Sequence, residues 1–202
     1  MQVGIVDSGG ANIASIQFAL DRVGAPSFVS NEVNKLKKAQ KLILPGVGAA
    51  QKAMHNLRDH GLIEFLQNGT QPLLGICLGM QLLFEFSEEG QVDCLGLLPG
   101  KVLSIPDKKG YSIPHMGWNQ LQVLRSSSIT QGIPDQSYVY FVHSFYVEVS
   151  PACIASTDYH LDMAAIVGQY GVWGCQFHPE RSGSIGTQIL ENFCKTNERR
   201  EQ

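Results

Sequence analysis

The sequence contains no long apolar run and no strong excess of either charge. No apolar stretch approaches the ~20 residues that a membrane-spanning helix needs. The 202 residues include 15 Lys and Arg against 18 Asp and Glu, a formal net charge of −3. This near balance argues against a surface for nucleic acid or anionic membranes. The first residues, Met1 to Asp7, read as a strand without a secretory signal. We therefore expect a cytoplasmic protein with neither a nucleic-acid nor a membrane partner.

Cysteine and histidine are also sparse and scattered. The five cysteines are odd in number and include no Cys-x-x-Cys motif, and the six histidines include no His-x-x-x-His pair. This usage argues against a disulfide framework or a zinc site and favours reduced thiols. Gly9-Gly10 follows the first apolar run but lacks the spacing of the dinucleotide-binding motif Gly-x-Gly-x-x-Gly. We expect no metal and no cofactor.

The first half of the chain alternates short apolar runs with segments of helical periodicity. Strands are predicted at 3–7, 27–30, 41–44 and 73–77, and helices at 12–23, 31–40, 49–67 and 79–86. Strands alternating with helices are typical of a parallel sheet covered on both faces. The sequence therefore predicts an α/β fold with a mostly parallel central sheet.

The second half is rich in β-type segments. Strands are predicted at 99–105, 119–124, 138–148 and 152–157, a strand-like run at 163–173, and a final helix at 184–196. We expect these strands to form an additional, partly antiparallel β region. With no repeats and no long linker, residues 1–202 are predicted to be one domain. The charged tail, 197–202, is predicted to be frayed.

A Gly-x-Cys-x-Gly motif lies where a predicted strand meets a predicted helix. Cys77 stands between Gly75 and Gly79, after Pro72-Leu73-Leu74 and before a helix-like run. This is the thiol form of a nucleophile elbow, a turn so tight that glycines must flank its nucleophile. Backbone N–H groups at a helix start favour a thiolate over a thiol. Although a lone cysteine is more often a small core residue, this context predicts that Cys77 is a nucleophile.

A histidine and a glutamate follow a hundred residues later. Pro179 directs His178 towards an extended conformation, in which residues i and i+2 lie on one face. Glu180 can then hold one imidazole nitrogen while the other accepts the Cys77 proton. The sequence thus predicts a nucleophile, a base and an orienting carboxylate, although either of the last two residues alone could be an ordinary surface group.

These motifs resemble the class I glutamine amidotransferases, and the resemblance covers nearly the whole chain. It is carried by Pro45-Gly46-Val47-Gly48, Gly75 through Gly90, Leu95 through Gly100, Pro114 through Asn119, Tyr140 through Phe145, and Gln176 through Gly183. The segments 114–119 and 140–145 are more selective and are similar to the glutaminase subunits of imidazole glycerol phosphate synthases. The first turn departs from the family pattern: it reads Asp7-Ser8-Gly9-Gly10-Ala11-Asn12, where an Asp-Tyr-Gly-x-Gly-Asn is usual.

The resemblance implies a flavodoxin-like fold and hydrolysis of L-glutamine to glutamate and ammonia. The N–H of Leu78, next after the nucleophile, is expected to be one oxyanion donor, and the resemblance gives the Val47 amide as the second. It also places the substrate near Gly48 and Gln81, with the segment His143-Ser144-Phe145 offering backbone groups to its amino and carboxylate ends.

The resemblance further implies a second chain. Nothing in the sequence reads as an acceptor domain for ammonia, which is mostly protonated and unreactive once released into neutral water. The family partner is a cyclase subunit, HisF, with which the glutaminase forms a heterodimer in histidine biosynthesis. The expected contact residues lie in one apolar and aromatic segment: Pro114, Met116, Trp118 and Asn119.

Two other functions remain open at this point. One is a different hydrolase on the same scaffold, either a γ-glutamyl hydrolase or the glutaminase subunit of another pathway. Dependence of activity on the cyclase would separate that interpretation from the first. The other is a non-catalytic, redox-sensing module with a reactive Cys77, against which the spacing of His178 and Glu180 argues. Whether glutamine protects Cys77 from an alkylating reagent would separate this last interpretation from the glutaminase.

Overall fold

The computed structural model describes residues 1–9 and 12–200. Gly10 and Ala11 of the divergent first turn, and residues 201–202 of the tail, lie outside the described residues. The first half contains β1 (Val3–Val6), α1 (Ile13–Arg22), β2 (Ser27–Ser30), α2 (Val33–Leu36), β3 (Lys41–Gly46), α3 (Ala50–Asp59), α4 (Leu62–Asn68), β4 (Leu73–Cys77) and α5 (Leu78–Gln81). The strands β5 (Phe86–Ser87), β6 (Val92–Asp93), β7 (Lys101–Ser104), β8 (His115–Gln120), β9 (Gln122–Val123) and β10 (Tyr138–His143) follow, with the 3-10 helix η1 (Ser128–Thr130) between the last two. The chain ends with β11 (Phe145–Val147), β12 (Cys153–Asp158), β13 (Asp162–Gln169), β14 (Val172–Cys175), the 3-10 helix η2 (Pro179–Arg181) and α6 (Gly183–Lys195).

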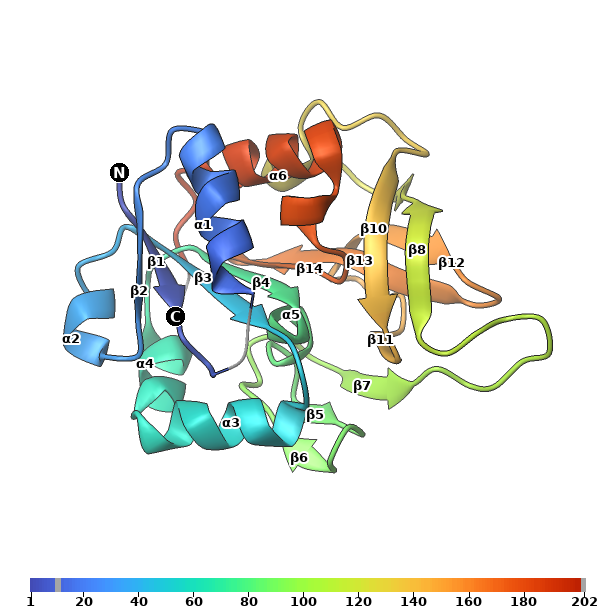
Figure 1. The fold of residues 1–202 in the computed structure, drawn as a ribbon, viewed down its shortest axis with the longest axis horizontal. Helices are drawn as coiled ribbons and strands as arrows, with labels where there is room; N and C mark the ends of the chain where they lie inside the picture. The colour runs from blue at the N-terminus through green and yellow to red at the C-terminus, as the bar shows by residue number, and fades with distance from the viewer. Residues whose placement is uncertain (10–11, 201–202) are drawn as a thin grey trace.

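An eight-stranded sheet runs through the molecule in the order β2-β1-β3-β4-β14-β13-β12-β9 (Figure 1). The five strands from β2 to β14 are parallel, and β13, β12 and β9 extend the sheet in antiparallel pairs. The predicted α/β fold with a mostly parallel sheet is confirmed. The carboxyl ends of β3, β4 and β14 lie side by side, so residues that follow these strands meet at one edge.

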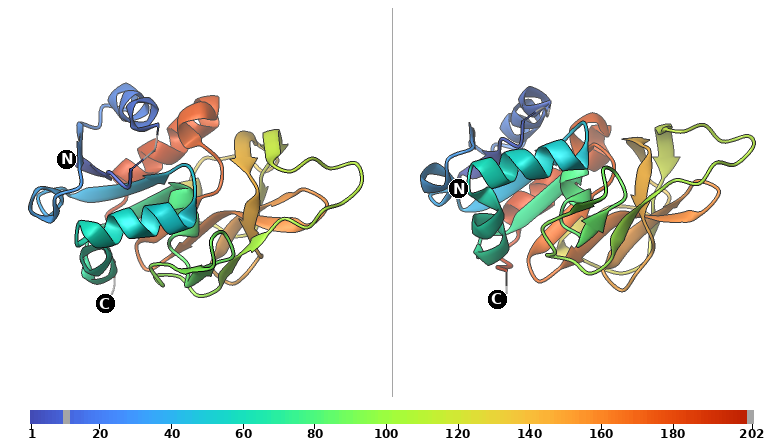
Figure 2. Two further views of the ribbon diagram at one scale, coloured as in Figure 1. Left: turned by 60° about the horizontal axis from the view of Figure 1, so that its bottom comes forward. Right: turned by 90° about the horizontal axis from the view of Figure 1, so that it is seen from below.

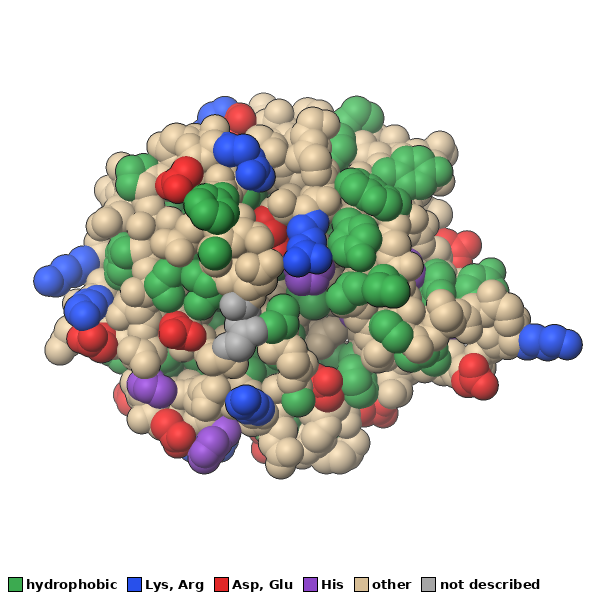
Figure 3. All heavy atoms as spheres, in the orientation of Figure 1, with side chains coloured by type: hydrophobic (Ala, Val, Ile, Leu, Met, Phe, Trp, Pro, Cys, Tyr) green, Lys and Arg blue, Asp and Glu red, His purple; other side chains and the backbone are tan. Residues whose placement is uncertain are grey.

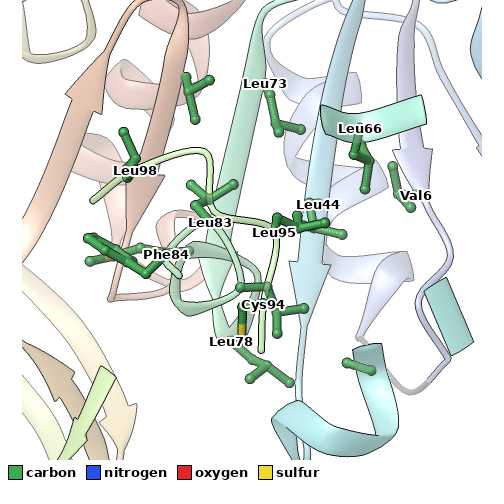
Figure 4. Close-up of a cluster of buried hydrophobic side chains, with 14 of the residues drawn as sticks. Val6, Leu44, Leu66, Leu73, Leu78, Leu83, Phe84, Cys94, Leu95 and Leu98 are labelled. Carbon is green, nitrogen blue, oxygen red and sulfur yellow. The ribbon is translucent and has the colours of Figure 1, made fainter. Parts of the chain in front are cut away.

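The apolar runs of β1, β3 and β4 are continuous because both faces of the sheet are buried. In β3, Leu42 and Leu44 point into the core under α3 and α4, while Ile43 points to the opposite core, under α1 and α6. The two turned views show these helix pairs on opposite faces of the sheet (Figure 2). The core on the α3 side also contains the segment 94–98, with Leu95 and Leu98 packed near Leu83 and Phe84 (Figure 4).

Two smaller sheets lie beside the main one. Strands β8 and β10 pair antiparallel, and β11, β7, β5 and β6 form a second, four-stranded sheet. A long loop, 105–114, leads from β7 to β8 and projects from the molecule (Figure 1). None of the helices in the described residues is long and apolar enough to cross a membrane.

The helix predicted at 79–86 is wrong in length, because α5 ends after one turn at Gln81. The carbonyls of Leu83 and Phe84, which a longer helix would use internally, instead accept N–H groups from the segment 96–98. The N–H of Glu85 donates to Gly100, and the chain then enters the short strand β5, which the sequence pattern did not indicate. Long-range pairing therefore overrides the helical periodicity of this stretch.

Other predicted elements are divided by turns. The single run at 163–173 is the hairpin of β13 and β14, with Tyr170 and Gly171 at φ of 51° and 75°. Positive φ at both central residues is the geometry of a two-residue type I′ turn. The helical stretch 49–67 is divided at Gly61, which has a φ of 64°. Against the expected frayed tail, Arg200 is buried, and its N–H donates to the carbonyl of Thr70 at 3.2 Å.

Candidate active site

Cys77 stands at the junction of β4 and α5 in strained backbone. Its φ of 55° and ψ of −114° are rare for a residue with a side chain. A Cβ on Gly75 would approach the Gly79 carbonyl oxygen to 2.5 Å, and a Cβ on Gly79 would overlap the Leu44 carbonyl. The strand and the helix can therefore come this close only with glycine at both positions. Strain of this kind is found at catalytic nucleophiles and is compensated by the surrounding packing.

His178 and Glu180 form a buried pair beside this elbow. His178 Nδ1 lies 2.9 Å from Glu180 Oε1, and the exposed fractions of the two side chains are 10% and 3%. The sequence predicted this contact from an extended chain, but the backbone differs. His178 itself is extended, with φ −99° and ψ 97°, and Pro179 then begins the 3-10 helix η2. The tight turn brings Glu180 back to the ring.

The surroundings of His178 favour its charged form. Burial of the ring lowers the pKa of His178, but hydrogen bonding and charge attraction from Cys77 and Glu180 outweigh burial and raise the pKa to about 10. A thiolate beside an imidazolium is the reactive state of a cysteine nucleophile.

A cleft of about 250 Å³ opens beside Cys77 and His178. It is lined by Val47, Gly48, Cys77, Leu78, Gln81, Glu89, Pro114, Val142, His143, Ser144, Phe145 and His178. The structure thus brings together all the residues that were expected to form the oxyanion site or to bind the substrate. Pro114, expected at a partner interface, is exposed and also lines this cleft. Glu180 lies behind His178 and is not part of the lining.

Gln81 is a buried residue of the cleft lining. Its side-chain N–H₂ donates to the Phe145 carbonyl at 3.0 Å and to Gln176 Oε1 at 3.0 Å. Gln81 therefore ties α5 to β11 and to the segment that follows β14. These bonds fix the side chain that the sequence places one helical turn after the nucleophile.

Glu89 is a cleft residue that the sequence reasoning did not single out. One oxygen, Oε2, accepts the N–H of Ala50 at 2.8 Å, at the start of α3. Burial raises the pKa of Glu89, while the Ala50 hydrogen bond lowers it. The only available signal was the acidic pair Glu88-Glu89 after the elbow. Nothing in the local sequence shows that this loop returns to α3.

The loop expected to hold the second oxyanion donor follows β3. Val47 is 41% exposed and Gly48 has a φ of 94°, a backbone state that favours glycine. Ser8, from the divergent first turn, donates its hydroxyl to the carbonyl of Pro45 at 3.1 Å. The first turn thus contacts the base of this loop.

The segment 115–119 alternates between two environments. Met116 and Trp118 are 64% and 56% exposed, whereas Asn119 is half-buried and its side chain donates to the carbonyl of Asp158 at 2.8 Å. Hydrophobic side chains gather on the surface over β8 and β10 (Figure 3). The outer face of this strand pair therefore has the apolar character of a contact surface. Within residues 1–9 and 12–200, no cluster of three or more His, Cys, Asp or Glu residues could hold a metal ion.

A cysteine elbow on a parallel sheet, with a histidine and a glutamate after a neighbouring strand, defines a class I glutamine amidotransferase. The chain belongs to that family, whose model, "Glutamine amidotransferase class-I", matches residues 5–197. Within the family it belongs with the imidazole glycerol phosphate synthase subunits HisH. It is 47% identical over 193 residues to the HisH of Haemophilus influenzae strain Rd, covering 96% of each chain. It is 49% identical over 189 residues to the HisH of Xanthomonas campestris pv. campestris strain 8004, covering 94% of each.

More distant solved structures share the fold. A putative GMP synthase component from Thermoplasma acidophilum superposes with a TM-score of 0.75 at 20% identity, covering 96% of this chain and 92% of its own. The structure of PurLQS from Thermotoga maritima gives a TM-score of 0.72 at 21% identity, covering 96% and 97%. At these identities the likeness is one of fold alone.

Proposed function

We propose that this chain is the glutaminase subunit of imidazole glycerol phosphate synthase. It hydrolyses L-glutamine to glutamate and ammonia and passes the ammonia to a cyclase subunit, HisF, in the cytoplasm. The observation that carries the proposal is that Cys77 and His178 line one cleft, with Glu180 bonded to His178, in a chain 47–49% identical to HisH subunits. Neither a γ-glutamyl hydrolase nor a redox sensor has a comparable observation in its favour.

The chemistry begins with the Cys77 thiolate. It attacks the side-chain amide carbon of glutamine, and the carbonyl oxygen takes up the negative charge of a tetrahedral intermediate. His178 gives its proton to the amide nitrogen, which leaves as ammonia, and a γ-glutamyl thioester remains. His178, now neutral, removes a proton from water, which attacks the thioester, and glutamate is released as the Cys77 thiolate re-forms. Glu180 steadies the imidazolium throughout.

The oxyanion requires two N–H donors. We assign them to Leu78, directly after the nucleophile, and to Val47, in the exposed loop after β3. One such donor contributes about 2.7–4 kcal/mol to transition-state stability. Because Val47 lies between two glycines, its peptide can turn towards or away from the cleft. That freedom suits a control step in which the partner favours the inward arrangement.

The cleft also suits the amino-acid end of glutamine. Glu89 is the carboxylate among the residues that line the cleft, so we assign it to the α-ammonium group of the substrate. The backbone groups of the segment 143–145 and of Gly48 are then left to bind the α-carboxylate. Gln81 holds that segment in place through the Phe145 carbonyl.

The test is a glutaminase assay of the chain alone and with the cyclase subunit. We expect a slow rate alone and a rise of roughly 10²–10³-fold with the cyclase and its ligand, the effect of one restored oxyanion donor. A full rate without any partner would rule out the gating, and no glutamine turnover under either condition would rule out the function. Trp118→Ala should weaken activation more than it affects folding. Tyr170→Ala, an exposed aromatic at the distant β13–β14 turn, is the matched control.

A further inference from the structure

Two buried histidines face one another across the β8–β10 pair. His115 and His143 are register partners, and His115 Nδ1 lies 2.9 Å from His143 Nε2. Each is almost fully buried, with exposed fractions of 3% and 6%. Neither the cysteine mechanism nor the oxyanion site uses the side chain of His115.

The hydrogen bonds at both ends fix where the protons lie. His143 Nδ1 is 2.8 Å from the Phe145 carbonyl, which can only accept, so this nitrogen carries a hydrogen. In a neutral ring His143 Nε2 must then accept, and His115 Nδ1 must donate to it. His115 Nε2 is left as an acceptor for Asn119 Nδ2, 3.3 Å away.

Asn119 closes the sequence of bonds. Its Oδ1 accepts the N–H of Gln120 at 2.8 Å, which identifies the other atom as the amide nitrogen. That nitrogen has two hydrogens, one for the Asp158 carbonyl and one for His115. Every donor from Asn119 to Phe145 therefore points the same way. We call Asn119, His115, His143 and the Phe145 carbonyl the histidine chain.

The environment keeps both rings neutral. His115 is stacked between Phe141 and Tyr159, with ring centroids 4.9 Å and 4.0 Å away. Burial lowers the pKa of His115 to about 4. Burial is the main reason that the pKa of His143 is lowered to about 3. The hydrogen bond to Phe145 raises this pKa, whereas the charges of His115 and His178 lower it further. A neutral His143 also spares His178 the repulsion of a second cation.

The histidine chain joins the cleft to an exposed face. At its inner end, the Phe145 carbonyl also accepts the Gln81 side chain, so His143 and Gln81 hold one oxygen from two sides. At its outer end, His115 and Asn119 alternate along β8 with the exposed side chains of Met116 and Trp118. These bonds therefore connect β8 to the wall of the cleft.

We propose that Asn119, His115 and His143 are positioning residues that hold the Phe145 carbonyl, and with it the substrate-binding segment 143–145, in register with the outward face of β8. The proposal rests on the glutaminase function and adds to it a route by which the β8 surface orders the glutamine site. It makes no claim on the chemical step, which belongs to Cys77 and His178. The expected signature is weaker glutamine binding with little change in turnover.

The kinetic test uses His115→Phe in the complex with the cyclase subunit. Phenylalanine keeps the ring stacked between Phe141 and Tyr159 but removes both nitrogens. A hydrogen bond of this kind contributes about 0.5–1.5 kcal/mol, so the KM for glutamine should rise about threefold to tenfold. The kcat should stay within about twofold, the pattern of a lost binding contact. His55→Phe, an exposed histidine on α3, is the matched control and should leave both constants unchanged.

Asn119→Leu is the second variant, because at this half-buried position it removes the first donor of the histidine chain, together with the Asp158 and Gln120 contacts of Asn119, and leaves both histidine rings in place. It should raise KM in the same direction but less, and it serves if His115→Phe does not fold, as judged by circular dichroism. An unchanged KM in a folded His115→Phe protein would overturn the proposal. Absence of glutaminase activity in the wild-type complex would instead refute the function on which it rests.

Nitrogen-15 NMR of the histidine-labelled chain tests the proton order without any assay. We expect His115 and His143 both to carry their hydrogen on Nδ1 at neutral pH, the less common tautomer in free histidine. In His115→Phe, the His143 resonances should shift because Nε2 loses its donor. A hydrogen on Nε2 of either residue in the wild-type chain would overturn the proposal. The resonances are assigned by comparison with His143→Asn.

Discussion

His178 Nδ1 lies 2.9 Å from Glu180 Oε1, and the carboxylate is shielded from water, because the Glu180 side chain is only 3% exposed. The proximity of this carboxylate and of Cys77 raises the pKa of His178 to about 10 despite the opposing effect of burial. At neutral pH the ring is therefore an imidazolium, the form that can protonate a leaving nitrogen. The pair sets the charge of the site as well as its geometry.

Glu180→Gln should separate charge from shape. The amide keeps the size of the side chain but removes the anion, so the pKa of His178 should fall. General acid–base catalysis contributes about 10²–10⁴-fold, and we expect kcat to drop by about 10²-fold. The alkaline limb of the kcat/KM profile should move to lower pH, because the imidazolium is lost sooner. Unchanged turnover would mean that Glu180 is only a structural group.

Cys77→Ala should abolish glutamine hydrolysis, because it removes the proposed nucleophile. The fold should survive, because the substitution removes only one sulfur atom from the packing. Glutamine should still bind, which calorimetry can measure. As controls, Cys94→Ala, Cys153→Ala and Cys194→Ala should keep their turnover. Substantial hydrolysis by Cys77→Ala would require another nucleophile in the cleft.

Local sequence was sufficient for the parallel strands and the elbow. β3 and β4 are apolar on both faces, and steric crowding allows only glycine at positions 75 and 79. Physical constraints of this kind act over a few residues, so they are visible in the sequence pattern. The extent of α5 was not predictable, because distant N–H groups from the segment 96–98 take the carbonyls that would continue the helix.

The cleft shows the same division. Cys77, His178 and Glu180 carry recognisable spacing, whereas Glu89 enters the site only because the loop after β5 packs on α3. His115 and His143 are 28 residues apart, and their contact depends on the register of β8 and β10. Asn119, predicted to lie at a partner surface, is half-buried, and its side chain also bonds to the carbonyl of Asp158, a contact that the sequence did not indicate. Inward or outward orientation on these strands depends on a register that no local motif fixes.

Glu89→Gln should weaken glutamine binding. The amide oxygen can still accept the Ala50 N–H, so the start of α3 is preserved, but the charge proposed for the α-ammonium group is lost. Hydrogen bonds to charged groups contribute about 1.5–3 kcal/mol, which corresponds to a rise in KM of about 10–100-fold. Steady-state kinetics with glutamine would measure it, and Glu64→Gln on the exposed face of α4 is the control. A KM equal to that of the wild type would exclude Glu89 from the substrate site.

The free energy of unfolding should decline on both sides of neutral pH, for opposite reasons. The pKa values of His115 and His143 are lowered in the folded state to about 4 and about 3. The unfolded chain therefore binds more protons below about pH 6.5, and stability falls as the pH drops from there. For His178 the pKa is raised to about 10, so its stabilising contribution is complete below about pH 6.5 and is lost as the pH rises towards 10. Urea unfolding at pH 5, 7 and 9 measures both the acid and the alkaline decline in the free energy of unfolding.

Three variants separate the two causes. His115→Phe should flatten the acid limb of this stability profile, and Glu180→Gln should flatten the alkaline limb, while His55→Phe should alter neither. An acid limb of the same slope in His115→Phe would show that the buried histidine pair does not govern acid sensitivity.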